Sequence, residues 1–70
     1  EQSIPTSFLC PITHEVMENP VLVIESGHSY EEAAILHWFS SHRTDPLTNI
    51  SLSCLAFVDN HTLRNAIQEF

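Results

Sequence analysis

Seven side chains of this 70-residue sequence could bind a metal or act on a substrate: two cysteines and five histidines. Structural zinc sites usually contain pairs such as C-x-x-C or H-x3-5-H, because two ligands must converge on the ion from one turn. Cys10 and Cys54 lie far apart, and His37 and His42 have a suitable spacing but no cysteine pair to join them. We therefore expect no metal site and no other cofactor.

Cys10 is the best candidate for a nucleophile, with His14 or His28 as its base. The spacing selects neither pair. Cys10 also lies beside Pro11 in an apolar stretch, where a cysteine is more often a small buried side chain. We therefore expect no residue that forms a covalent intermediate in this chain.

The charge of the chain excludes two classes of partner. The chain has nine acidic residues, two arginines and no lysine, so its formal net charge is −7. Binding to nucleic acid or to an anionic membrane surface needs clustered Lys and Arg, which this chain lacks. Two cysteines are also too few for the disulfide framework of a small secreted domain. We expect a protein of the cytoplasm or nucleus that binds neither nucleic acid nor membrane.

The elements that must position the candidate residues are short. Residues 20–30 predict a β-hairpin that turns at Gly27, the only glycine. Residues 29–32 fit a capping box at the start of a helix over 31–40. A final helix begins near Asn60, a good N-cap. Its apolar face carries Leu63, Ala66, Ile67 and Phe70. These elements predict one small α+β domain over residues 1–70, without internal repeats.

Two loops of this domain are unusually apolar. Ile12 lies in the first loop and Pro46-Leu47 in the second, while Trp38 lies near the end of the first helix. Core packing would explain part of this pattern. An apolar surface for a partner protein would explain it equally well, since aromatic and aliphatic side chains anchor such surfaces. Composition alone leaves both explanations open.

An ordered series of motifs runs through the whole chain. It comprises Ile4-Pro5, Phe8-x-Cys10-Pro11-Ile12-Thr13-x-Glu15-Val16-Met17-x-x-Pro20-Val21, Gly27-His28-Ser29-Tyr30-Glu31, Ile35-x-x-Trp38, Asp45-Pro46-x-Thr48-x-x-x-Leu52 and Asn60-x-x-Leu63-Arg64-x-x-Ile67. In this order and spacing the motifs resemble the U-box, the RING-like domain of a class of ubiquitin ligases. The resemblance implies a zinc-free RING-like fold in which two loops flank a β-hairpin and a central helix, followed by a C-terminal helix. Hydrogen bonds and ion pairs would hold the loops, and the polar candidates for that task are Thr13, Glu15, Ser26, Asp45 and Thr48.

The resemblance also implies a function. U-box domains dock a ubiquitin-conjugating enzyme that carries ubiquitin as a thioester, and they promote transfer of the ubiquitin to a substrate lysine. Carried over by position, the docking residues are Ile12 and His14 in the first loop, Trp38 in the helix and Pro46 in the second loop. Asn49 stands where many active members have an Arg or Lys that contacts ubiquitin. The alternative is therefore a degenerate U-box that binds a protein without promoting transfer.

Further expectations follow from the resemblance. Substrate choice lies outside the U-box in this family, so we expect the 70 residues to be part of a longer protein. Some members dimerise, which makes a homodimer a further expectation. Bacterial pathogens inject similar domains into host cells, and for such a protein the compartment would be the host cytoplasm.

Overall fold

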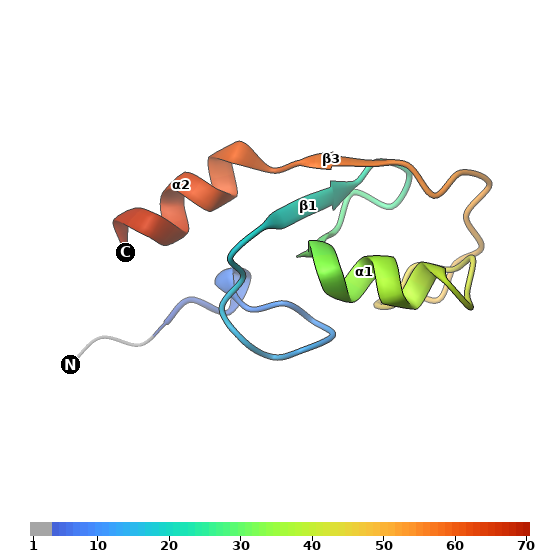
Figure 1. The fold of residues 1–70 in the computed structure, drawn as a ribbon, viewed down its shortest axis with the longest axis horizontal. Helices are drawn as coiled ribbons and strands as arrows, with labels where there is room; N and C mark the ends of the chain where they lie inside the picture. The colour runs from blue at the N-terminus through green and yellow to red at the C-terminus, as the bar shows by residue number, and fades with distance from the viewer. Residues whose placement is uncertain (1–3) are drawn as a thin grey trace.

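The computed structural model describes residues 4–70, which form a three-stranded antiparallel sheet and two α-helices (Figure 1). Strand β1 (Pro20–Val23) lies in the middle, between β2 (Ser29–Glu31) and β3 (Phe57–Asp59). The predicted α+β class is confirmed. The sequence analysis missed β3, because three residues are too few to show a strand's alternation of apolar and polar side chains.

The predicted β-hairpin is present in strands β1 and β2. Val21 pairs with Tyr30 in an antiparallel register. Gly27 adopts a φ of 77°, and its amide donates to the Val23 carbonyl over 2.8 Å. Glycine adopts this left-handed conformation without the clash that a Cβ atom would cause. The only glycine of the chain therefore lies where the turn requires it.

Helix α1 (Glu32–Phe39) begins one residue later than predicted, and the predicted capping box is wrong. The N-cap position is held by Glu31, and no side chain caps the first turn. Ser29 belongs to the extended strand β2, so its hydroxyl is not placed beside the helix amides. The Ser29 Oγ instead accepts a hydrogen bond from Asn60 Nδ2 over 2.9 Å. Strand pairing has overridden the local capping signal.

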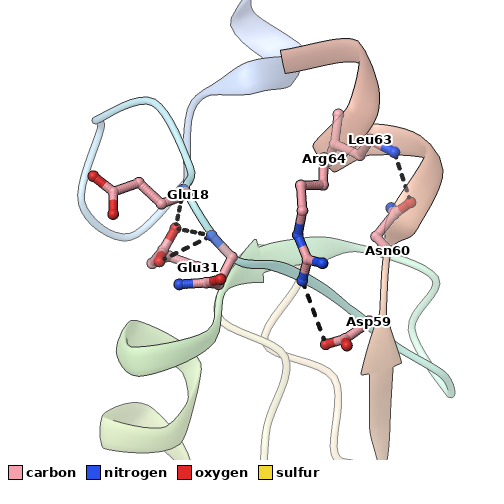
Figure 2. Close-up of polar contacts among 7 residues, drawn as sticks. Glu18, Glu31, Asp59, Asn60, Leu63 and Arg64 are labelled. Atoms are coloured by element: carbon pink, nitrogen blue, oxygen red, sulfur yellow. Dashed lines mark hydrogen bonds and ion pairs between the residues drawn. The ribbon is translucent and has the colours of Figure 1, made fainter. Parts of the chain in front are cut away.

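Helix α2 (His61–Glu69) begins as the sequence predicts. Asn60 is its N-cap, and the Asn60 Oδ1 accepts from the Leu63 amide over 3.1 Å (Figure 2). Since the other end of the same amide donates to Ser29, Asn60 also ties α2 to strand β2. Arg64 reaches back from α2 to Asp59 over 3.8 Å. Among residues 4–70, no helix is long and apolar enough to cross a bilayer.

The core joins the sheet, α1 and the two apolar loops. Its buried apolar members are Cys10, Met17, Val21, Val23, Tyr30, Ile35 and Leu52. The Cys10 side chain is fully buried, as the sequence analysis expected of a small apolar side chain. A thiol in that position is not exposed to a substrate. The loops are therefore held partly by the core itself.

Candidate functional site

Two loops of equal length have the same backbone construction. Loop 1 (residues 9–16) and loop 2 (residues 44–51) are each closed by an antiparallel bridge between their first and last residues. Each contains the same short turn, Pro-Ile-Thr at 11–13 and Pro-Leu-Thr at 46–48. The two loops are therefore alike in backbone construction. The sequence alone did not show this likeness, because only a proline and a threonine are identical in the two short segments.

The hydrogen bonds within the two loops also match. The His14 amide donates to the Cys10 carbonyl over 2.7 Å, and the Asn49 amide donates to the Asp45 carbonyl over 2.7 Å. His14 and Asn49 both adopt a positive φ, 61° and 62° respectively. Asn and His are enriched among the non-glycine residues that adopt this conformation. Two residues predicted to contact the partner are therefore the two left-handed residues of the loops.

Loop 2 is held from inside by Asp45, whose side chain is fully buried. One carboxylate oxygen accepts from the Tyr30 hydroxyl over 2.8 Å. The other accepts from the Leu47 amide over 3.1 Å, the Thr48 amide over 3.0 Å and the Thr48 hydroxyl over 3.1 Å. The predicted roles of Asp45 and Thr48 in holding this loop are confirmed.

The pKa values of this network show its protonation state. Burial acts to raise the pKa of Asp45, but hydrogen bonds from Ser26, Thr48 and Tyr30 outweigh burial and hold that pKa below its ordinary value of 3.8. Burial and the hydrogen bond to Asp45 raise the pKa of Tyr30 above its ordinary value. Near neutral pH, Asp45 is therefore a carboxylate and Tyr30 a neutral donor.

Loop 1 is held differently, because Cys10 occupies the position that Asp45 has in loop 2. The Cys10 Sγ accepts from the Glu31 amide over 3.2 Å. The Glu31 carboxylate in turn accepts from the Glu18 amide over 2.8 Å and the Asn19 amide over 3.3 Å (Figure 2). Glu31 therefore braces the chain just after loop 1, a role that the sequence analysis did not predict.

Of the remaining polar candidates, Thr13 and Glu15 interact within loop 1, while Ser26 also interacts with Asp45 in loop 2. The Thr13 Oγ1 accepts from the Glu15 amide within loop 1 over 3.2 Å. The Ser26 Oγ accepts from the His28 amide in the hairpin turn over 3.3 Å. Among residues 4–70, no three His, Cys, Asp or Glu side chains are grouped to hold a metal ion. In the described chain, the loops are held by protein hydrogen bonds.

The five predicted site residues are distributed over both loops and α1. Ile12 is half-buried and packs against the core, whereas His14 is exposed. Pro46 is half-buried and Asn49 exposed in loop 2. Trp38 is half-buried, and its Nε1 donates to the carbonyl of Thr44, the first residue of loop 2, over 2.7 Å. Trp38 and loop 2 are therefore directly joined.

Leu47 is an exposed apolar residue of the loop 2 turn that the predicted site omits. It has the same place in loop 2 that Ile12 has in loop 1, and it is 55% exposed. A shallow groove of about 570 Å³ is lined by Leu47 and Pro11 together with Phe8 and Leu63 of α2. Comparison of the two Pro-x-Thr segments in the sequence would have pointed to Leu47.

Comparison with known proteins places this arrangement in a family. The protein-family model described as "U-box domain" matches residues 4–70 of the chain. The chain is 49% identical over 70 residues to U-box domain-containing protein 57 of Arabidopsis thaliana, covering 99% of this chain and 18% of that protein. It is 42% identical over 69 residues to WD repeat, SAM and U-box domain-containing protein 1 of Gallus gallus, covering 97% and 14%. The chain thus spans less than a fifth of either relative, and it belongs to the U-box family.

Proposed function

We propose that this chain is a ubiquitin-ligase module that docks a ubiquitin-loaded conjugating enzyme and promotes transfer of ubiquitin to a substrate lysine. Membership of the U-box family supports a ligase-type role in general. The observation that carries the proposal is the pair of matching loops, each with an apolar residue at its turn, Ile12 or Leu47. Hydrogen bonds hold both turns in place before any partner arrives, which lowers the entropy lost on docking.

The proposed mechanism is positioning, in which the thioester stays on the conjugating enzyme. Cys10 is fully buried and is not available to carry ubiquitin, and Cys54, which is exposed, lies outside the two loops, just after the end of loop 2. A docked conjugating enzyme holds its thioester on a flexible ubiquitin, and restricting that conjugate increases the fraction poised for attack by an amine. Ile12, His14, Trp38 and Pro46 would make the docking contacts.

Charge would assist the encounter. The chain has a net charge of −7, and the acidic residues outnumber the two arginines. A conjugating enzyme with a basic docking face would be steered toward such a surface, mainly through a faster association rate. The absence of lysine also means that the ligase could not modify a lysine side chain within these 70 residues.

The test is single-turnover discharge of ubiquitin from loaded conjugating enzymes to free lysine. We expect the chain to accelerate discharge from at least one basic-faced member of a small panel. Binding without acceleration across the panel would contradict the ligase proposal. It would leave the second candidate, an interaction module that holds a protein without transfer.

Asn49 is the observation that favours this second candidate. Its amide can donate hydrogen bonds, but it lacks the charge and reach of the Arg or Lys found there in many active members. Asn49 is exposed at the end of the loop 2 turn, so a longer side chain has room to extend from it. The position can therefore be tested without disturbing the core.

We expect Asn49→Arg to speed ubiquitin discharge by about threefold or more, because a charged guanidinium donates stronger hydrogen bonds than an amide. The positive φ of 62° costs arginine some stability, so thermal melting should be measured in parallel. Asn49→Gly is the matched control, since it relieves the backbone without adding a donor. A discharge rate that rises equally in both variants, or in neither, would show that a donor at this position is not limiting.

A further inference from the structure

The indole of Trp38 is covered by a second ring. The imidazole of His42 stacks on it with 3.8 Å between ring centroids and 9° between ring planes. The His42 amide donates to the Trp38 carbonyl over 3.0 Å. The His42 Nδ1 lies 2.9 Å from the Ser41 Oγ and 3.3 Å from the same carbonyl. The backbone and the ring of His42 are thus both fixed against the end of α1.

The stacked pair lies directly beside loop 2. Trp38 packs against the core, and its Nε1 donates to the Thr44 carbonyl over 2.7 Å. Thr44 forms the bridge to Ser51 that closes loop 2. Just outside this bridge, the Leu52 amide donates to the Arg43 carbonyl over 2.8 Å. The indole of Trp38 is therefore hydrogen-bonded to the base of loop 2.

We propose that His42 is a positioning residue for loop 2. Its imidazole holds the Trp38 indole in the orientation from which Nε1 reaches Thr44, and so keeps Pro46 and its neighbours in place for docking. A contact between two aromatic rings stabilises a side-chain orientation beyond the area that it buries. The part of this inference that concerns docking rests on the proposed ligase function. The part that concerns the order of loop 2 does not.

Intrinsic fluorescence tests the stack in solution, because Trp38 is the only tryptophan of the chain. A ring stacked on the indole limits the access of dissolved molecules to it. His42→Ala should therefore increase the quenching of the Trp38 emission by acrylamide at neutral pH. His37→Ala, which removes an exposed histidine of α1, should leave the quenching at the wild-type level. Equal quenching in wild-type and His42→Ala would overturn the proposal.

Amide hydrogen exchange tests the effect on loop 2 independently of any ligase activity. In His42→Ala the Leu52 and Asp45 amides should exchange about threefold faster or more, since their hydrogen bonds close the loop. The Leu63 amide, capped by Asn60 in α2, should not change. His42→Phe keeps a ring on the indole and should restore slow exchange. Unchanged exchange at Leu52 and Asp45 in His42→Ala would overturn the proposal.

Discharge kinetics complete the test. His42→Ala should raise the half-saturating concentration of the loaded conjugating enzyme by about three- to tenfold and leave the maximal rate unchanged. His42→Phe should remain close to wild type, and so should His37→Ala. Normal discharge by His42→Ala with an active wild type would refute the docking role alone. An inactive wild type would refute the ligase function, while the exchange measurement would still decide the role of His42 in loop 2.

Discussion

Replacing Asp45 with alanine is expected to lower the free energy of unfolding by about 3 kcal/mol, a large part of the stability of so small a domain. The carboxylate is fully buried and accepts from Tyr30, Leu47 and Thr48. Its removal leaves the buried Tyr30 hydroxyl and the part-buried amides of Leu47 and Thr48 without their acceptor, and it opens a cavity under loop 2. Thermal and urea denaturation should show a melting temperature lower by roughly 12–24 °C.

Asp59→Ala is the matched control for this experiment. Asp59 is half-exposed, and its ion pair with Arg64 spans 3.8 Å at the surface. Exposed pairs of this kind contribute less than about 1 kcal/mol. If Asp45→Ala melted no lower than Asp59→Ala, the buried network would not be what holds loop 2.

The same network predicts how stability depends on pH. Because hydrogen bonds hold the folded-state pKa of Asp45 below 3.8, the ionised carboxylate stabilises the folded state at any pH above that ordinary value. This contribution is lost as the pH falls through the lower, folded-state pKa. Glu25, whose pKa is lowered by hydrogen bonds from Ser53, acts with the same sign. We therefore expect the midpoint of urea unfolding to fall steadily below about pH 4.

Asp45→Asn separates the contribution of Asp45 from that of Glu25. An amide of similar size does not titrate, so the difference in stability between wild type and Asp45→Asn should shrink as the pH is lowered. Urea denaturation at several pH values between about 6 and 2 measures that difference. A difference that stayed constant over this range would mean that Asp45 is not the titrating group.

The second large effect is expected at Ile12. Ile12→Ala should weaken docking of the loaded conjugating enzyme about thirtyfold, or about 2 kcal/mol, because central apolar anchors contribute most to such interfaces. Discharge measured against enzyme concentration should show a higher half-saturating concentration. Ile12 is also half-buried against the core, so a modest loss of stability is expected in addition. The assay should therefore be run well below the melting temperature of the variant.

Val58→Ala is the control for Ile12. Val58 is also a large apolar residue, 49% exposed, but it lies on β3 along the edge of the molecule opposite loop 1 (Figure 1). Its truncation should leave both docking and discharge near wild type. If Ile12→Ala discharged ubiquitin as fast as Val58→Ala, Ile12 would not belong to the docking surface. Docking would then depend on the other residues of the two loops.

Several features could be predicted from the sequence because their causes are local. Asn60 caps α2 through an amide three residues away, and Gly27 permits a turn that few other residues tolerate. The burial of Cys10 followed from its apolar neighbours. The order and spacing of the motifs predicted the U-box family, because both are properties of the sequence itself. The candidate site could be named in the same way, by position.

Other features depend on partners that are distant in sequence, and only the tertiary structure decided them. Pairing with β1 drew Ser29 and Glu31 into a strand and cancelled a capping box that looked complete locally. Asp45 accepts a hydrogen bond from Tyr30, which lies 15 positions away in the sequence. His42 covers Trp38 just where that indole reaches loop 2. A local pattern shows which hydrogen bonds a residue is able to make, but the packing of the whole chain selects which of them form.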